Sequence, residues 1–407
     1  MSLEFEQLST VLDEMSQSEL QRLQQQEDNL AQALQKLHLY AANWRAIAAC
    51  VALVEAKKPT IRLARPLDEA EPLNAGIPLP PIPAQATLIA TDGSQILPDR
   101  HAAFLYYLLN VGGVIYHHGS GHSPTEFSRP LLKFHEADLF INGQLVDGTV
   151  VGARRDLLEI QTLAEMADAY AAATPPRLVV MDQRLLYWPA SSMAGREERS
   201  QIIEGWLAAM THIRRSAALL AGYIDRPRRS SVLTLLALLQ PDLTDFFDMV
   251  ARQDDWGNLT DTHLFTWLLA PGERSRVFVD MSNDNDHYRQ ADPQNEVCFF
   301  YLNAASVDAD HPAPQIARVD IPRWVADDET AVAHVHALLY DQCQILGRYP
   351  YIITRADEKA VVGRQDQAEL NHWIELKMQQ RGINAAITAK QISKEYVRAG
   401  KTRHELR

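Results

Sequence analysis

The sequence predicts an α/β fold in which helices flank a mixed sheet and a long helical arm precedes it. Three observations lead to this class. An apolar repeat near the N-terminus has the period of a packed helix, short apolar runs typical of strands begin at Thr87, and amphipathic helical segments separate those runs. The chain is 46% hydrophobic and 22% charged over 407 residues, which is ordinary globular composition and enough length for roughly two or three domains or one elaborated core.

The arm is predicted from Glu19 to Lys58, within a region of residues 1–58. Its apolar residues recur every seven positions, at Leu23, Leu30, Leu37, Trp44 and Val51. Such a seam must pack on another helix. Two partners fit equally well: residues 3–15 of the same chain, folded back as a hairpin, or a second copy of the arm. Residues 59–86 follow as a proline-rich connector, since proline blocks helix and favours extended chain.

A core domain is predicted over residues 87–381. Its first half comprises a strand at Thr87–Asp92, a hairpin, a helix at Ala153–Ala173 and a buried strand at Arg177–Asp182. The hairpin would join residues 103–111 and 114–118 through Gly112-Gly113, because glycine pairs are common in tight turns.

The second half contains a helical insertion and further strands and helices. The insertion spans residues 196–270, strands follow at 276–281, 296–303 and 316–321, and helices at 329–346 and 365–380. Residues Tyr349–Thr354 are expected as an extended entry into Asp357. A basic tail, residues 382–407, ends the chain.

Cysteine content and charge exclude several classes of protein. Cys50, Cys298 and Cys343 are far apart, which excludes a zinc knuckle or disulfide framework and fits a reducing compartment. No long apolar run or signal-peptide pattern is present, so we expect a cytoplasmic protein without a membrane partner. The net charge of −13 gives no support for a nucleic-acid partner, but Arg154-Arg155 and Arg226–Arg229 are basic clusters within the acidic chain.

Three acidic residues stand out within the predicted core. Asp92 and Asp182 each end a strand, and Glu159 falls within the apolar stripe of the helix between them, whereas Glu165 points to solvent. A buried carboxylate is costly unless it is paired or binds a cation. Together these oxygens would suit Mg²⁺ or Mn²⁺. From spacing alone, three unrelated acids in turns and ion pairs are the commoner outcome, since Asp-Gly at a strand end is a frequent turn signal.

Several segments resemble the NurA nuclease family. The two that carry aspartates are Ile89–Gln95 (IATDGSQ) and Leu178–Asp182 (LVVMD). Four more follow in order: Ala221–Arg228 (AGYIDRPR), Gly272–Ser275 (GERS), Arg318–Trp324 (RVDIPRW) and Tyr349–Asp357 (YPYIITRAD). The resemblance implies a ribonuclease H-like core and a nuclease, typically Mn²⁺-dependent, that cuts single-stranded DNA and duplex ends. It also implies a homodimer that works with the hexameric HerA helicase–translocase in DNA end resection during double-strand break repair.

The resemblance carries the site over residue by residue. Asp92 and Asp182 match the motif aspartates, Glu159 matches the helical glutamate with Glu165 as the alternative, and Asp357 falls at a late metal-site position. These four residues would hold two Mn²⁺ or Mg²⁺ ions for hydrolysis of a phosphodiester. The chain departs from the family in one place, because Gln183-Arg184 replaces the usual Gly-Ser after the second aspartate. Arg184 would either contact phosphate or weaken activity.

DNA would lie in a channel of a dimer lined by basic side chains, namely Arg154, Arg155, Arg184 and Lys359. No nucleotide cofactor is expected, because the phosphate-loop-like Gly400-Lys401-Thr402 has Glu395 where a glycine is required. Two rival functions remain. The protein could be a non-catalytic dimeric subunit of a DNA-translocating motor, as Gln183-Arg184 would favour, or a hydrolase with a carboxylate pair such as a glycosidase.

Overall fold

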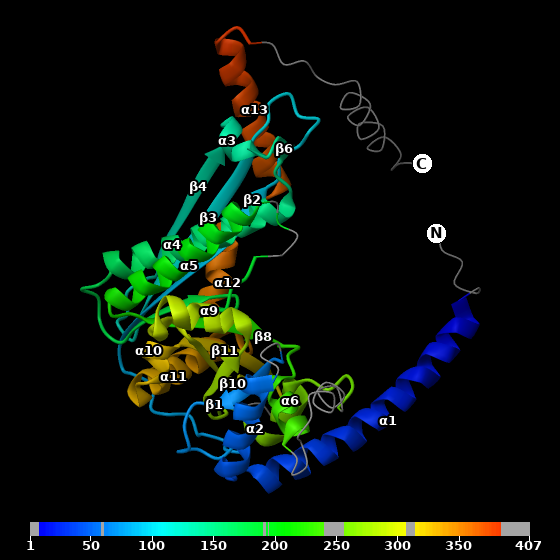
Figure 1. Ribbon diagram of the computed structural model, residues 1–407. Helices are drawn as coiled ribbons and strands as arrows, with labels where there is room; N and C mark the ends of the chain where they lie inside the picture. The colour runs from blue at the N-terminus through cyan, green and yellow to red at the C-terminus, as the bar shows by residue number, and fades with distance from the viewer. Residues whose placement is uncertain are drawn as a thin grey trace, which may run out of the picture. The chain divides into compact units, whose positions relative to one another are not determined.

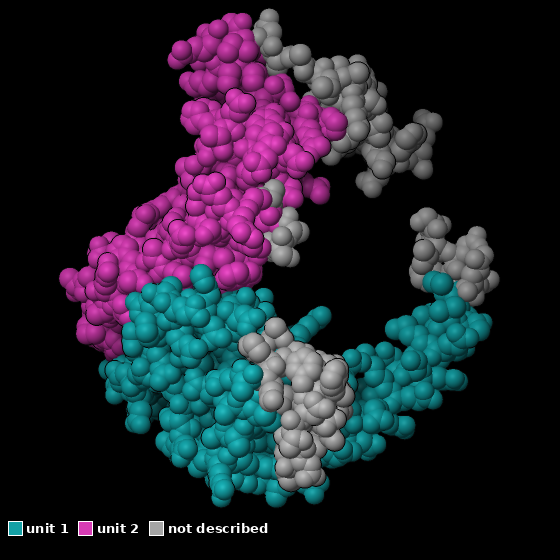
Figure 2. All heavy atoms as spheres, viewed as in Figure 1, with its two compact units in different colours: residues 1–84, 182–186, 219–351 teal, residues 85–181, 187–218, 352–407 magenta. Residues whose placement is uncertain are grey.

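The computed structural model describes residues 8–57, 61–189, 193, 195–239, 256–306 and 314–383. It divides into two compact units (Figure 2). Unit 1 comprises Met1–Ala84, Asp182–Leu186 and Leu219–Tyr351, and unit 2 comprises Gln85–Met181, Tyr187–Ala218 and Ile352–Arg407. Both units contain a sheet with helices, so the predicted α/β class is confirmed (Figure 1). The predicted tail and the motif at Gly400 fall almost wholly outside the described residues.

The strands of unit 1 form an antiparallel arrangement in the order β1-β9-β10-β11-β8. Its elements are α1 (Ser9–Tyr40), α2 (Trp44–Lys57), β1 (Leu63–Pro66), β8 (Leu219–Asp225), α6 (Ser231–Leu238), α8 (Asp261–Leu268), β9 (Phe278–Met281), α9 (Asn283–Ala291), the 3₁₀ turn η2 (Pro293–Asn295), β10 (Val297–Asn303), β11 (Ile316–Pro322), α10 (Arg323–Ala326) and α11 (Glu329–Leu346). Every residue of β10 and β11 is buried, so both faces of these strands are covered.

The N-terminal arm is two helices, which corrects the prediction of one long helix. α1 ends at Tyr40, and α2 restarts after a bend of 111°. Asn43 explains the break, because its side chain accepts a hydrogen bond from the backbone N–H of Ala46 at 3.2 Å, the role of a helix N-cap. Residues 9–15 lie within α1 itself, so they do not fold back on it as a hairpin.

Only the C-terminal half of α1 is packed, with Ala33 and Leu37 fully buried. Its N-terminal half leaves an apolar row exposed, formed by Leu8, Val11, Leu12, Met15, Leu20 and Leu23. No single helix in the described ranges is long and apolar enough to cross a membrane, and the bent pair α1–α2 passes that test only when the two helices are taken together.

The strands of unit 2 form a mixed sheet in the order β7-β2-β3-β4, in which β2 and β7 are parallel and the other pairs antiparallel. Its elements are β2 (Ala86–Ile96), β3 (Tyr107–His118), β4 (Thr125–Lys133), α3 (Glu136–Leu139), the small pair β5 (Phe140–Ile141) and β6 (Gln144–Leu145), α4 (Gly148–Ala169), β7 (Arg177–Met181), α5 (Arg196–Arg215), α12 (Tyr351–Ala360) and α13 (Arg364–Gln380). Three antiparallel strands, a helix and a strand parallel to the first are the ribonuclease H-like order that we expected.

One continuous strand, β3, replaces the hairpin predicted at Gly112-Gly113. The two glycines serve close packing rather than a turn. A Cβ at Gly112 would collide with the backbone of Ala360, and one at Gly113 would collide with the ring of Phe127. Glycine in a strand commonly marks such a close backbone approach.

α12 is the third correction, since residues 349–354 were expected to be extended. The β-branched Ile352, Ile353 and Thr354 suggested a strand. The buried positions Ile352, Ala356 and Ala360 recur every four residues, however, and this is the spacing of a helix face. Asp357 therefore lies on a helix.

Candidate active site

Asp92 lies near the C-terminal end of the parallel strand pair of unit 2. It is half-buried, and its carboxylate accepts a hydrogen bond from the N–H of Gly93 at 2.8 Å. The β2–β7 register ends at the pair Thr91 and Met181. Asp92 directly follows Thr91, and Asp182 directly follows Met181. In open α/β sheets, sites form at the carboxyl ends of parallel strands. Asp182 is exposed and belongs to the segment assigned to unit 1.

Glu159 is buried on α4, with only 3% of its surface exposed. α4 is started by Asp147, whose carboxylate accepts from the N–H groups of Thr149 and Val150. Thr91 then joins strand to helix, since its hydroxyl donates to the carbonyl of Glu159 at 3.3 Å. The predicted burial of Glu159 is confirmed. Its role as a metal ligand stays a prediction.

Gly93 leaves room for the α4 side chains. A Cβ at this position would lie 2.8 Å from Cγ of Arg155 and 3.4 Å from Oε2 of Glu159. Glu165, the alternative ligand, is exposed and forms an ion pair with Arg129 on β4 at 2.9 Å. The apolar stripe of the predicted helix therefore distinguished the buried Glu159 from the exposed Glu165 correctly.

Arg155 is the positive charge among these acids. Its guanidinium donates to Asp156. Burial alone would lower the pKa of Arg155, but the carboxylates of Asp156, Glu159 and Asp92 raise it above its ordinary value. The arginine is thus within electrostatic reach of three carboxylates.

Tyr187 is a member of this environment that the sequence did not indicate. Burial raises the pKa of its hydroxyl, and Asp156 and Glu159 raise it further. Its ring stacks on Trp206 with centroids 4.5 Å apart. The side chain therefore stays a neutral phenol beside the acids.

The end of α12 is held on the opposite face of β2 from α4. The carbonyl of Ala360 accepts from Ser94 and, at 2.8 Å, from the amide of Asn110. Asp92 pairs directly with Gly112, which faces Ala360, and directly opposed residues share a face of the sheet. The side chain of Asp92 therefore leaves β2 on the α12 face, but it still lies within electrostatic reach of Arg155 on α4. Asp357 is exposed on α12, one turn before Ala360.

Three of the predicted DNA contacts have intramolecular partners, and the Asp156 partner of Arg155 is described above. Arg154 donates to Glu198 at 2.7 Å, to the hydroxyl of Tyr107 at 2.8 Å and to the carbonyl of Asp138 at 2.6 Å, and its contact with DNA stays a prediction. Lys359 pairs with Glu126 at 2.6 Å and remains partly exposed. Hydrogen bonds from Lys359 and Arg355 lower the pKa of Glu126.

Arg184 is exposed and belongs to unit 1. Within the ranges that the structure describes, no set of three or more His, Cys, Asp or Glu side chains is spaced to hold a metal ion. The complete ligand set therefore stays a prediction. The individual donors are carboxylate oxygens, which suit Mn²⁺ and Mg²⁺.

Comparison with known proteins gives a family. The NurA domain model matches residues 86–362. The NurA nuclease from Sulfolobus solfataricus is similar in structure with a TM-score of 0.48 at 12% identity, over 72% of this chain and 85% of that one. A NurA structure bound to dAMP and manganese gives a TM-score of 0.35 at 10% identity, over 73% and 89%. The catalytic domain of human endonuclease V gives 0.32 at 12% identity, over 71% and 84%.

No curated protein matches the chain by sequence. The NurA model nevertheless covers more than half of the chain, including Asp92, Glu159 and Asp357. The chain therefore belongs to the NurA domain family, a family of nucleases.

Proposed function

We propose that this protein is a divalent-metal-dependent deoxyribonuclease. The observation that supports this most is Glu159, a carboxylate that is 3% exposed beside the Asp92-Gly93 strand end. A carboxylate in such a place is costly unless a cation offsets its charge. Arg155 lies within electrostatic reach of Asp156, Glu159 and Asp92, and carboxylate oxygens are the ligands that Mn²⁺ and Mg²⁺ prefer.

Asp92, Glu159, Asp182 and Asp357 would hold Mn²⁺ or Mg²⁺, with two ions as the expected number. When bound, such ions supply activation of water and charge neutralisation at a scissile phosphate. Arg155 would keep Glu159 and Asp92 ionised and oriented. Lys359, which is partly exposed, would exchange Glu126 for a DNA phosphate.

The proposal includes the partners that the family resemblance implies. The substrate is single-stranded DNA and duplex ends, and the protein works as a homodimer with a HerA-type hexameric ATPase in DNA end resection in the cytoplasm. The exposed apolar row on α1 supports an assembly role, since exposed groups of apolar side chains often mark protein–protein interaction sites.

The test is cleavage of end-labelled single-stranded DNA in Mn²⁺, Mg²⁺ or EDTA by the full chain and by Asp92→Ala. We expect metal-dependent cutting that the substitution reduces at least about 10³-fold, as is usual when a ligand of the reacting metal is lost. Asp168→Ala is the matched control, because Asp168 is an exposed aspartate on α4. Activity of Asp92→Ala equal to that of the control would refute the site.

A second candidate, a non-catalytic assembly subunit, is favoured by Gln183-Arg184 and by the apolar row on α1. Calorimetric titration with Mn²⁺ separates the two functions without any cleavage assay. Binding that Asp92→Ala abolishes supports the nuclease. Absence of Mn²⁺ binding and of cutting, with or without the motor, supports the subunit.

A further inference from the structure

Unit 1 contains an open cleft of about 610 Å³ that arginines dominate. Six of them line it: Arg62, Arg184, Arg226, Arg228, Arg229 and Arg318. Among the described residues that form its wall, none is acidic and none is aromatic. The cleft lies wholly within unit 1, and the acids around Arg155 are in unit 2. It is therefore a candidate anion site that residues of unit 1 form by themselves.

The fold of unit 1 brings these arginines together from four stretches of the chain. They are Arg62 before β1, Arg184 in residues 182–186, Arg226–Arg229 after β8, and Arg318 on β11. A Cβ at Gly222 on β8 would collide with the carbonyl of Gln183, so only glycine lets residues 182–186 pass this close. The N–H of Leu185 then donates to Asp320 on β11 at 3.2 Å. Together these contacts fix Arg184 at the cleft. Arg226 adopts a left-handed φ of 45°, a conformation that is uncommon for a non-glycine residue and clusters at functional sites.

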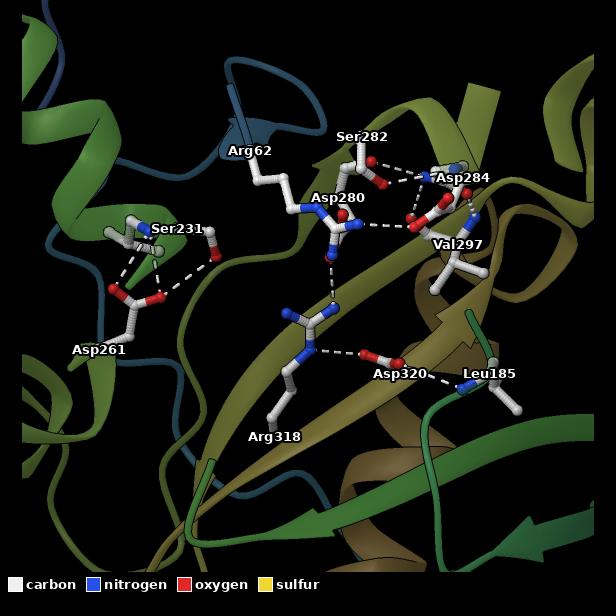
Figure 3. Close-up of polar contacts among 12 residues, drawn as sticks. Arg62, Leu185, Ser231, Asp261, Asp280, Ser282, Asp284, Val297, Arg318 and Asp320 are labelled. Atoms are coloured by element: carbon white, nitrogen blue, oxygen red, sulfur yellow. Dashed lines mark hydrogen bonds and ion pairs between the residues drawn. The ribbon is translucent and has the colours of Figure 1, made fainter. Parts of the chain in front are cut away.

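The deepest arginine is only partly satisfied by its own partners. Figure 3 shows Arg318, which is 1% exposed, bonded to Asp320 at 2.6 Å and to Asp280 at 2.9 Å. Its Nη1 is buried and has no hydrogen-bond partner. A buried guanidinium nitrogen without an acceptor is costly. An anion entering the cleft, which Arg318 lines, would supply that acceptor.

Two of the outer arginines have a carboxylate partner, since Arg62 pairs with Asp284 at 2.7 Å and Arg226 lies 3.7 Å from Asp225. Among the described residues of unit 1, Arg228 and Arg229 form no ion pair. Burial lowers the pKa of Arg229; Asp280 opposes the shift, whereas Arg318, Arg184 and Arg62 lower the pKa further. The N-terminus of α6, in contrast, is already capped by Asp261, which accepts from Val232 and Leu233. The anion site is thus made by side chains.

We infer that this arginine cleft binds phosphate groups of the backbone of single-stranded DNA, an inference that rests on the proposed nuclease function. Guanidinium groups are the preferred bidentate partners of phosphate. None of the described residues that line the cleft is aromatic, so none of them offers a surface on which a base can stack, which favours recognition of the backbone over a free nucleotide. The replacement of Gly-Ser by Gln183-Arg184 then adds a phosphate contact to the cleft.

The test measures binding of a fluorescein-labelled oligodeoxythymidylate to the full chain in EDTA, where no metal-dependent cutting occurs. The variants are Arg184→Gln and Arg228→Gln, both at exposed positions. Arg348→Gln is the matched control, an exposed arginine of unit 1 outside the cleft. We expect each cleft variant to raise Kd about tenfold, the effect of losing one charge-assisted hydrogen bond. Each should lower the slope of log K against log salt by about 0.7, the value for one phosphate of a single strand.

Unchanged Kd and salt slope in both cleft variants, or no binding by the wild type, would overturn this inference. Neither result touches the nuclease proposal, which the Asp92→Ala cleavage assay decides. Wild-type binding that the cleft variants weaken, without cutting in any metal, would keep the cleft and refute the nuclease. A last outcome is that the cleft variants lose binding of tripolyphosphate but keep binding of DNA. This would assign the cleft to a small anion and would also overturn the inference.

Discussion

Arg155 in unit 2 and Arg229 in unit 1 are half-buried arginines in opposite surroundings. Arg155 lies within reach of the carboxylates of Asp156, Glu159 and Asp92, which raise its pKa against the effect of burial. Arg229 is influenced by Asp280 and by three arginines, and its pKa is lowered by burial and by those arginines. The charged groups named for Arg155 are thus carboxylates, whereas three of the four named for Arg229 are arginines.

The difference shows that this acidic chain separates its charges locally. The net charge of −13 describes the whole molecule, but the field at each site depends on the few groups that face it. A region rich in carboxylates suits a cation, and a cleft whose described wall carries arginines and no acid suits a phosphate chain. A metal-dependent nuclease needs both, so the two regions support one function.

The largest effect is expected for Glu159→Gln, which removes a charge but keeps the shape. Because Glu159 is 3% exposed beside Gly93, we expect DNA cleavage to fall about 10³-fold, equivalent to ~4 kcal/mol, with the thermal midpoint kept or raised. Single-turnover cleavage in Mn²⁺ measures the loss. Glu165→Gln on the same helix is the control and should cut normally, and the reverse pattern would make Glu165 the functional residue.

The second prediction concerns the buried ion pair between Arg318 and Asp320 in unit 1. Asp320→Ala leaves Arg318, which is 1% exposed, with Asp280 as its remaining carboxylate, and it removes the acceptor for Leu185 N–H. Removal of one partner from a buried pair costs about 3–5 kcal/mol. Urea unfolding followed by circular dichroism measures it. Asp327→Ala, which breaks the exposed pair with Arg323, should cost under about 1 kcal/mol, and equal losses in both variants would contradict the buried network.

The sequence was most informative where a pattern is local. The helix of residues 329–346 was predicted with the bounds that α11 has. The apolar stripe of the helix at residues 153–173 predicted that Glu159 is buried and that Glu165 faces solvent. Where tertiary contacts decide, the patterns failed. Gly112-Gly113 has the composition of a turn, yet the approach of α12 explains Gly112 and the ring of Phe127 explains Gly113, and neither approach is encoded nearby.

The arginine cleft could not be predicted for the same reason. Arg62, Arg184, Arg318 and the Arg226–Arg229 run are separated by long stretches of chain, and only the strand pairing of unit 1 gathers them. The sequence indicated Arg184 and Arg226–Arg229 as basic. It gave no sign that they form one surface or that Arg318 lies beneath them.

The third prediction tests how α12 is seated in unit 2. Gly112→Ala places a methyl group against the backbone of Ala360, and backbone cannot move aside as a side chain can. We expect a loss of about 2 kcal/mol in the free energy of unfolding, in the range for overpacking, together with weaker hydrogen-exchange protection in residues 351–360. Gly148→Ala is the control, since its Cβ would make only ordinary contact with Leu97. Normal protection of α12 in Gly112→Ala would show that the strand–helix contact is looser than described.

The smallest effect on stability is expected for two helix N-caps, one in each unit, that make matching hydrogen bonds. Asp147 begins α4 by accepting from Thr149 and Val150, and Asp328 begins α11 by accepting from Thr330 and Ala331. Loss of such a cap costs about 1 kcal/mol in either unit. Hydrogen exchange should therefore rise in residues 148–169 for Asp147→Ala and in residues 329–346 for Asp328→Ala. Neither cap touches the acids around Arg155 or the arginine cleft, so cleavage and DNA affinity should stay within about twofold. If either variant loosened both helices equally, the two units would unfold as one, and stability and charge could no longer be assigned to separate regions.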